Sequence, residues 1–142
     1  MPFAWIEESP PRWDDAKARI IGAAPPGVFD FSAFQPGDLL PGQWWRVEVD
    51  LKTAGFGWMD CNWGDGEVLL AVDPAAERQG VGTFIVEHLL AEGAARGINY
   101  LYNVVPESHP DAEGIETWLE RRGFRRHGDG RLLRASTTHK AP

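Results

Sequence analysis

The sequence has little of what marks secreted and membrane-spanning proteins. Its 142 residues include a single cysteine, Cys61, so no disulfide can form within the chain, and we expect a cytoplasmic protein. The first 15 residues, MPFAWIEESPPRWDD, lack the basic start and apolar core of a signal peptide. No apolar run approaches the roughly 18 residues that a transmembrane helix needs. These absences predict a protein without a membrane segment or a membrane partner.

Positive charge and metal-binding side chains are also scarce. The chain has 14 Lys and Arg against 21 Asp and Glu, which gives a net charge of −7. A nucleic-acid-binding protein usually presents a basic face, and the one dense basic stretch here is 121–131, RRGFRRHGDGR. His109 with Asp111 is too small a donor set for a metal site. We therefore predict no nucleic-acid partner and no metal. An acidic surface attracts cationic partners such as amines, although it equally serves solubility alone.

Apolar residues make up 43% of the chain, and the chain length predicts one domain with a single core. Alternation and turn signals predict strands at 3–8, 44–50, 56–63, 67–74 and 98–105, with a closing hairpin of 124–127 and 131–136. Capping and spacing signals predict helices at 12–24, at 81–96, and from an N-cap at Ser108 to a stop at Gly123. Turns are expected at 52–55, 64–66 and 128–130, and a long ordered loop at 25–43.

One part of this pattern determines the expected sheet topology. The strand at 67–74 is nearly all apolar, so we expect it to be central and buried on both faces. An amphipathic helix at 81–96 and a further strand at 98–105 follow it. A strand–helix–strand unit makes its two strands parallel. We therefore predict a mixed α/β (α+β) fold, with a mostly antiparallel sheet, one parallel β-α-β splay and flanking helices.

The stretch ERQGVG, residues 77–82, lies between the central strand and this helix. Glycine loses more entropy on folding than any other residue, so two glycines here need a reason. Such a turn leaves backbone N–H groups free at a helix N-terminus, where a phosphate or pyrophosphate binds. The Gly-Lys-Ser/Thr ending of a P-loop and the third glycine of the dinucleotide fingerprint are both missing. On spacing alone the stretch is either an anion site or a tight turn without a ligand.

The wider context resembles a known family. The run LLAVDPAAERQGVGTFIVEHLLAEGAARGINYLYNVV, followed by WLERRGF, is similar to the GCN5-related N-acetyltransferase (GNAT) superfamily. The resemblance is strong over 66–124, and the order of elements extends it to about 44–135. It implies one acetyltransferase-like domain over 1–142, with a variable acceptor side at 1–43, a CoA-binding core at 44–135 and a frayed tail at 136–142.

The family resemblance also implies an activity. Acetyl-CoA would be the cosubstrate, and its acetyl group would pass directly, in a ternary complex, to a primary amine of a small molecule or peptide. The pantetheine arm would contact the backbone of Leu70, Ala71 and Val72, because its amides can pair with a strand edge. The N–H near Val72 would polarise the thioester carbonyl. The residues implied at the pyrophosphate are Arg78, Gln79, Gly80, Val81, Gly82 and Thr83.

Two positions depart from the family pattern. The first position of the turn motif is usually Gln or Arg, and here it is Glu77. The tyrosine that often protonates the departing thiolate falls on Leu119, which has no proton to give and reads as a core residue. The second departure leaves an alternative open, a non-catalytic acyl-CoA-binding or regulatory domain of the same fold. A third alternative is a structural domain whose glycine turn holds nothing.

Direct transfer needs a general base for the amine proton. Our catalytic candidates are Glu67, which opens the central strand, and Ser108 and His109, which follow the strand at 98–105. Each also has a structural interpretation: Glu67 as a hairpin residue, Ser108 as an N-cap and His109 as a solvent-facing residue. Further carboxylates near the expected splay are Glu48, Asp50, Asp60 and Glu107.

Tryptophan is unusually frequent, with seven in the chain. Four of them fall on the second and third predicted strands: Trp44, Trp45, Trp58 and Trp63. They would form either an aromatic acceptor pocket for an apolar or cationic substrate, or packing in the core and in a homodimer. The second interpretation is the simpler one for any single tryptophan.

Overall fold

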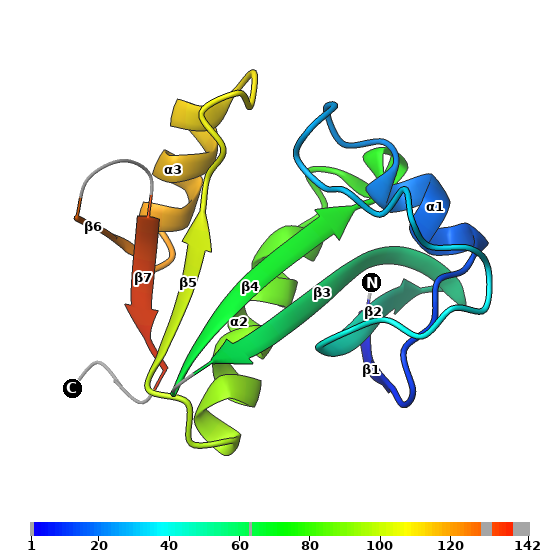
Figure 1. The fold of residues 1–142 in the computed structure, drawn as a ribbon, viewed down its shortest axis with the longest axis horizontal. Helices are drawn as coiled ribbons and strands as arrows, with labels where there is room; N and C mark the ends of the chain where they lie inside the picture. Colours follow the sequence, from blue (N-terminus) through cyan, green and yellow to red (C-terminus); the bar gives the residue numbers. More distant parts are fainter. Residues whose placement is uncertain (1, 63, 129–131, 138–142) are drawn as a thin grey trace.

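The computed structural model describes residues 2–62, 64–128 and 132–137. Its described strands form a 7-stranded sheet with the order β1-β2-β3-β4-β5-β7-β6 (Figure 1). The strands are β1 Ala4–Glu8, β2 Gln43–Val49, β3 Lys52–Asn62, β4 Asp65–Val72, β5 Tyr100–Val104, β6 Arg125–His127 and β7 Leu132–Ser136. The helices are α1 Asp15–Ile21, α2 Val81–Ala95 and α3 Ala112–Glu120, with a short 3-10 helix η1 at Pro74–Ala76. All neighbouring strands are antiparallel except β4 and β5. The predicted fold class is confirmed.

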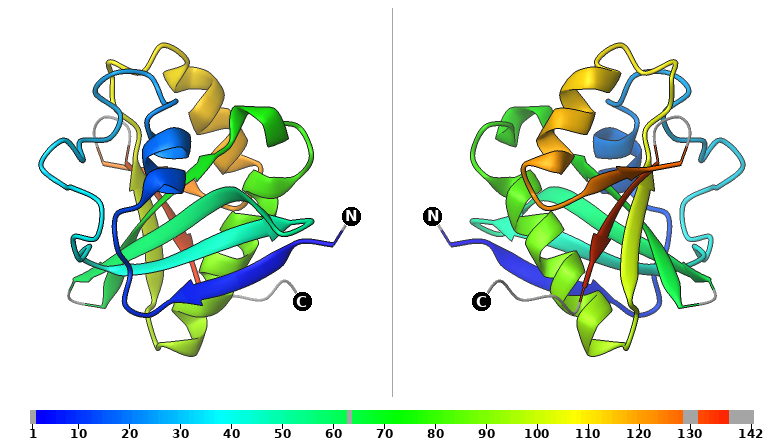
Figure 2. Two further views of the ribbon diagram at one scale, coloured as in Figure 1. Left: turned by 90° about the vertical axis from the view of Figure 1, so that its right-hand side faces the viewer. Right: turned by 90° about the vertical axis from the view of Figure 1, so that its left-hand side faces the viewer.

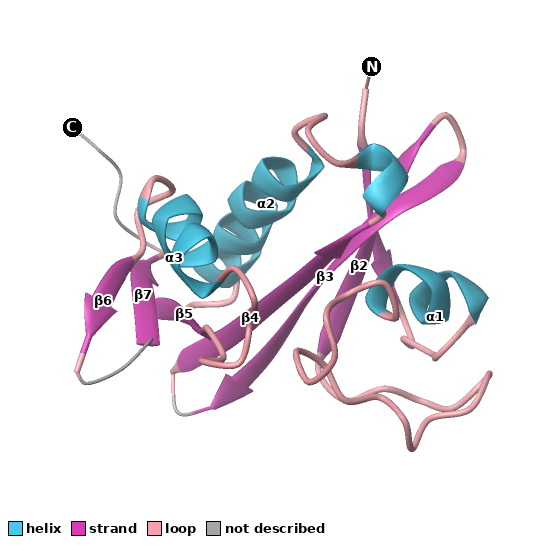
Figure 3. Ribbon diagram, turned by 90° about the horizontal axis from the view of Figure 1, so that it is seen from above, coloured by secondary structure: helices cyan, strands magenta, loops and turns pink. Residues whose placement is uncertain are grey.

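The helices lie on both faces of the sheet (Figures 2 and 3). Helices α2 and α3 cover one face, where the main core includes Trp45, Leu101 and Leu133, all at 0% exposure. Helix α1 and the loop after it cover the other face over β2 to β4, around Trp44 and Trp58. These two indoles stack with their centroids 4.3 Å apart. The three tryptophans that the structure describes on β2 and β3 are therefore buried core residues.

Strands β4 and β5 pair over a short length only. The parallel register runs from Asp65 with Tyr100 to Glu67 with Tyr102, and beyond it the two strands diverge (Figure 1). At the point of divergence the side-chain amide of Asn103 donates to the carbonyl of Val68 at 2.8 Å. The expected splay is therefore present, and β4 is central as predicted.

Burial along β4 departs in part from the expectation. Val68 and Ala71 are buried and pack in the cores on opposite faces of the sheet. Leu69 and Leu70 are only half-buried, because each packs against the edge of a core and also borders the cleft. An apolar strand that borders an empty cleft has the same sequence signature as a fully buried one.

One predicted turn and one predicted helix start are placed differently in the structure. The turn between β2 and β3 is at Asp50 and Leu51, which have φ of 52° and 67°, while the predicted turn residues 52–55 are already in β3. Helix α3 begins at Ala112 with Asp111 at its N-cap, so the predicted N-cap at Ser108 is wrong. The chain instead makes a separate turn at Ser108, where His109 N–H donates to the Pro106 carbonyl.

The N- and C-terminal predictions also need adjustment. Helix α1 is shorter than predicted, because Asp14 caps it by accepting from the Lys17 N–H. The last strand ends at Ser136, as its predicted range did, and Thr137, which the prediction placed in a frayed tail, is buried. Trp63, most of the predicted turn at 128–130 and the tail at 138–142 lie outside the described residues.

Candidate functional site

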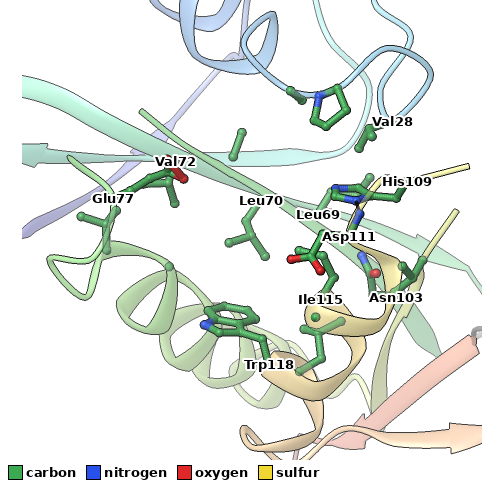
Figure 4. Close-up of a pocket in the computed structure, with 18 of the residues that line it drawn as sticks. Val28, Leu69, Leu70, Val72, Glu77, Asn103, His109, Asp111, Ile115 and Trp118 are labelled. Carbon is green, nitrogen blue, oxygen red and sulfur yellow. Dashed lines mark hydrogen bonds between the residues drawn. The ribbon is translucent and has the colours of Figure 1, made fainter. Parts of the chain in front are cut away.

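The diverging strands open a cleft of about 840 Å³. Its walls are β4, the turn between η1 and α2, the residues after β5, one face of α3 and the loop after α1 (Figure 4). The open edge of β4 forms one side. Asp73 N–H donates to Ala54 on β3, and backbone groups alternate along a strand, so those of Leu70 and Val72 point away from β3 toward the cleft. A strand edge with free amide groups is therefore available to a ligand.

The structure brings together most of the residues that the family resemblance implied for the cofactor. Those that line the cleft are Leu70, Ala71, Val72, Arg78, Gly80, Val81, Gly82 and Thr83. Gln79 is exposed and does not line it. By the alternation along β4, Ala71 directs its backbone groups to β3, where it pairs with Phe56. Among the three strand residues, this leaves Leu70 and Val72 with backbone groups free for a ligand.

The two glycines of the turn have different structural reasons. Gly80 has φ of 88°, a conformation that costs a residue with a Cβ atom roughly 1–2 kcal/mol. A Cβ atom there would have nothing within 4 Å. A Cβ atom on Gly82 would lie 3.0 Å from the ring of Trp118. Gly80 therefore allows the backbone turn, and Gly82 allows α3 to pack closely on α2.

Glu77 and Arg78 occupy the outer part of the turn, and both side chains are exposed. Arg78 has φ of 67°. A carboxylate repels a phosphate, but the exposure of Glu77 lets its carboxylate stay in water, where this repulsion is screened.

Glu67 lies just outside the cleft, on the same face of β4 as the cleft residue Leu69. Its neighbours across the sheet are Asp60 on β3 and Tyr102 on β5. Burial, together with the charge of Asp60, raises the pKa of Glu67 above the usual value for glutamate. A carboxylate with a raised pKa accepts a proton more readily, which is what a general base needs.

His109 lies in the cleft near Leu69 and Asn103 (Figure 4). Its Nδ1 accepts a hydrogen bond from the backbone N–H of Asp111 at 2.9 Å. A ring nitrogen that accepts cannot carry a proton, so the neutral ring holds its proton on Nε2. This tautomer can donate a hydrogen bond from Nε2, but it has no lone pair there to take a proton.

The other candidates are less favourably placed. Ser108 is exposed in its turn and does not line the cleft. Leu119 is 3% exposed and packs in the main core, as expected, so α3 has no hydroxyl at that position. Of the aromatic residues on the acceptor side, Phe29 borders the cleft and packs 5.3 Å from Trp58.

Among the cleft residues that the sequence did not predict as site residues are Asn103 from β5, and Asp111, Trp118 and Arg122 from the segment around α3. The signal was present in part. Asp111, Ile115, Trp118 and Arg122 recur every three or four residues, which is the spacing of one helix face. That face could equally have been assigned to the core, because nothing in the spacing shows whether a ligand or another helix covers it.

The described residues offer neither a cluster of metal-binding side chains nor a helix suited to a membrane. No group of three or more His, Cys, Asp or Glu side chains is close enough to hold a metal ion in this part of the chain. Among the same residues, no helix combines the length and apolar character needed to cross a membrane.

Comparison with protein families identifies the fold. A sequence model described as the acetyltransferase (GNAT) domain matches residues 41–126, which is more than half of the chain. The protein therefore belongs to the GNAT acetyltransferase family, and the family resemblance of its sequence is confirmed. No match was found among curated proteins.

Solved structures agree with this assignment. The ribosomal-protein-S18-alanine N-acetyltransferase from Escherichia coli is 25% identical, with a TM-score of 0.57 over 69% of this chain and 70% of that one. The PaiA N-acetyltransferase from Thermoplasma acidophilum, in complex with coenzyme A, is 15% identical, with a TM-score of 0.56 over 66% and 59% of the two chains. N-acetylglutamate synthase from Neisseria gonorrhoeae, in complex with coenzyme A and L-arginine, is 19% identical, with a TM-score of 0.57 over 68% and 25%. The last two comparisons show the fold alone.

Proposed function

We propose that this protein transfers an acetyl group from acetyl-CoA to a primary amine, directly and in a ternary complex. The observation that carries the proposal is the cleft between β4 and β5, with the glycine turn at its edge, in a chain of the GNAT acetyltransferase family. The acceptor is a small molecule or a peptide. A cytoplasmic location, a single domain over 1–142 and a homodimer are further parts of the proposal that the sequence suggested.

The cofactor would bind along one path. Its pantetheine amides would pair with the free backbone groups of Leu70 and Val72, as an added strand does. Its pyrophosphate would lie at the turn, on the N–H groups from Gly80 to Thr83. Two of the similar folds were solved in complex with coenzyme A, which supports a CoA-type ligand here.

Direct transfer would break the thioester C–S bond as the amide C–N bond forms. The departing CoA thiolate would take its proton from water, because the core residue Leu119 has none to give. When acetyl-CoA is bound, it supplies an activated carbonyl carbon. The N–H of Val72 faces the cleft and would hydrogen-bond the carbonyl oxygen as negative charge develops on it. Glu67 would take the amine proton. It lies two residues of strand, roughly 6.6 Å, from the cleft residue Leu69. We therefore expect one water to connect Glu67 to an amine bound in the cleft. His109 would donate from Nε2 to an acceptor atom in the cleft.

A first experiment is a thermal-melt and calorimetric titration with acetyl-CoA, CoA and ATP. Selective binding at about 100 times Kd adds roughly 2.7 kcal/mol to the free energy of unfolding. We expect stabilisation by both CoA species and none by ATP. Absence of stabilisation by either CoA species would contradict the proposal and leave the glycine turn as a turn without a ligand.

A second candidate function is a non-catalytic acyl-CoA-binding domain, favoured by Leu119 in place of a proton donor. A panel of amines separates the two functions, with free CoA thiol as the measured product. Release of CoA that depends on one class of amine supports the enzyme. Tight binding of acetyl-CoA with no release above the background hydrolysis rate, for any amine, supports the binding domain.

A further inference from the structure

Arg122 reaches across the floor of the cleft from the end of α3 to the first turn of α2. Its Nε and one terminal nitrogen both donate to the hydroxyl oxygen of Thr83, at 3.0 and 2.6 Å. The other terminal nitrogen donates to the carbonyl of Trp118 at 2.8 Å. The guanidinium also stacks on the Trp118 ring, 3.9 Å from its centroid. Arg122, Thr83 and Trp118 all line the cleft.

This arrangement determines what the Thr83 hydroxyl can do. A hydroxyl oxygen has two lone pairs and one proton. Both lone pairs are taken by Arg122, so the proton must point away from the guanidinium. None of the described residues accepts a hydrogen bond from it. Thr83 is therefore a donor to whatever enters the cleft.

Among the described residues, no carboxylate forms a salt bridge with Arg122. By contrast, Arg46 pairs with Glu48 at 2.8 Å and Arg19 pairs with Asp73. Arg122 is half-buried and its bonded partners are a hydroxyl, a carbonyl and an indole ring. Burial, and then the charge of Arg121, lower the pKa of Arg122, and the opposing influence of Glu87 is smaller. A cation that is partly removed from water gains from an anion in direct contact with it.

We propose that Arg122 and Thr83 form a phosphate subsite, in which Thr83 donates its hydroxyl proton and Arg122 supplies the positive charge to a phosphate group of the acyl-CoA cofactor. This inference rests on the proposed function. It also makes Arg122, which sequence reasoning did not select, the principal cationic contact in place of the exposed Arg78. The phosphate is either the pyrophosphate or the 3′-phosphate of the cofactor.

The test compares Arg122→Gln with Arg121→Gln. Both variants remove one positive charge, and Arg121 is exposed and does not line the cleft. The probes are CoA, 3′-dephospho-CoA and inorganic pyrophosphate, each titrated calorimetrically. We expect Arg122→Gln to weaken CoA binding about tenfold or more, since a charge-assisted hydrogen bond is lost, and Arg121→Gln to stay within twofold of the parent.

The probes identify the phosphate. An equal loss with 3′-dephospho-CoA and with pyrophosphate assigns the subsite to the pyrophosphate. A loss that disappears with 3′-dephospho-CoA assigns it to the 3′-phosphate. If Arg122→Gln and Arg121→Gln bind CoA within twofold of each other, the subsite is disproved.

A second pair of variants keeps the test valid if Arg122→Gln loosens α3. Thr83→Val removes the hydroxyl and keeps the arginine, and Thr83→Ser restores the hydroxyl. We expect the valine variant to bind CoA several-fold more weakly and the serine variant to bind like the parent; equal binding by both overturns the role of Thr83. If the parent binds no CoA species, the proposed function fails, and the pyrophosphate titration of the parent against Arg122→Gln then decides the subsite by itself.

Discussion

The side-chain amide of Asn103 donates to the backbone carbonyl of Val68 at 2.8 Å, across the point where β4 and β5 part. The last strand pair before it is Glu67 with Tyr102. The amide thus takes the place of the next ladder hydrogen bond and lets the strands separate without leaving the carbonyl of the buried Val68 unpaired. The cleft begins at the point where this side-chain hydrogen bond replaces a backbone hydrogen bond between the two strands.

We predict that Asn103→Ala destabilises the protein by about 1–3 kcal/mol, because a buried carbonyl loses its donor. Urea unfolding measures the change. The control is Asn99→Ala, at an exposed position one residue before β5, for which we expect a change within about 0.5 kcal/mol. Equal effects of the two substitutions would show that the Asn103 amide does not stabilise the splay.

The glycine turn gives a prediction that separates its two residues. Gly82→Ala brings a Cβ atom to 3.0 Å from the Trp118 ring, and we expect it to cost about 1–3 kcal/mol by overpacking. Trp118→Leu should remove most of that cost, since the ring is no longer there. Gly80→Ala should cost about 1–2 kcal/mol with either residue at 118, because its penalty comes from the positive φ of 88°.

The measurement is a double-mutant cycle by urea unfolding, with Gly80→Ala as the matched control. A coupling free energy between 82 and 118, and none between 80 and 118, is the expected result. If Gly82→Ala costs the same with and without Trp118, the close packing of α2 and α3 is not the reason for this glycine.

Much of the fold could be predicted from local patterns in the sequence. The helix at 81–95 has Gly80 at its N-cap and Gly97, with φ of 73°, just after it, so both of its ends have a strong local signal. The predictions were wrong where contacts between distant parts of the chain determine the local structure. Ser108 is a good N-cap residue by type, but Asp111 takes that place in the structure, although its side chain makes no capping bond.

The candidate site divides in the same way. The turn residues were found because a glycine motif is local in sequence. Arg122 was missed because its role depends on Thr83, which is 39 residues away in the chain and is hydrogen-bonded to it at 2.6 Å. His109 was selected by residue type, but its tautomer depends on the backbone N–H of Asp111, and no spacing rule contains that information.

Glu67 leads to a prediction about pH. Burial and Asp60 raise its pKa, so the folded protein binds this proton more tightly than the unfolded chain does. Stability from this group is then present below the ordinary pKa of glutamate and is lost as pH rises to the raised value. The quantity to compare is the free energy of unfolding of Glu67→Gln minus that of the parent. We expect this difference to be larger at neutral pH than in acid, as measured by urea unfolding at a series of pH values.

The same ionisation of Glu67 should affect activity in the opposite sense: stability falls as Glu67 loses its proton, whereas activity rises. As the base, Glu67 must be charged, so kcat/KM for the preferred amine should rise with pH through its raised pKa. Asp60→Asn removes the second cause of the shift and should move that limb to lower pH. If the limb does not move in Asp60→Asn and persists in Glu67→Gln, a different group is the base.

His109 gives the last prediction, because the tautomer set by Asp111 allows donation from Nε2 and not proton uptake. Glutamine also offers an N–H donor but cannot titrate, so His109→Gln should keep much more activity than His109→Ala. The acidic limb of the kcat/KM profile should be the same in His109→Gln as in the parent. The exposed His127 on β6 provides the control, and His127→Gln should leave both rate and profile unchanged. If His109→Gln loses the limb, the ring takes up a proton during turnover, the Asp111 N–H must release Nδ1 at that step, and His109 would replace Glu67 as the base.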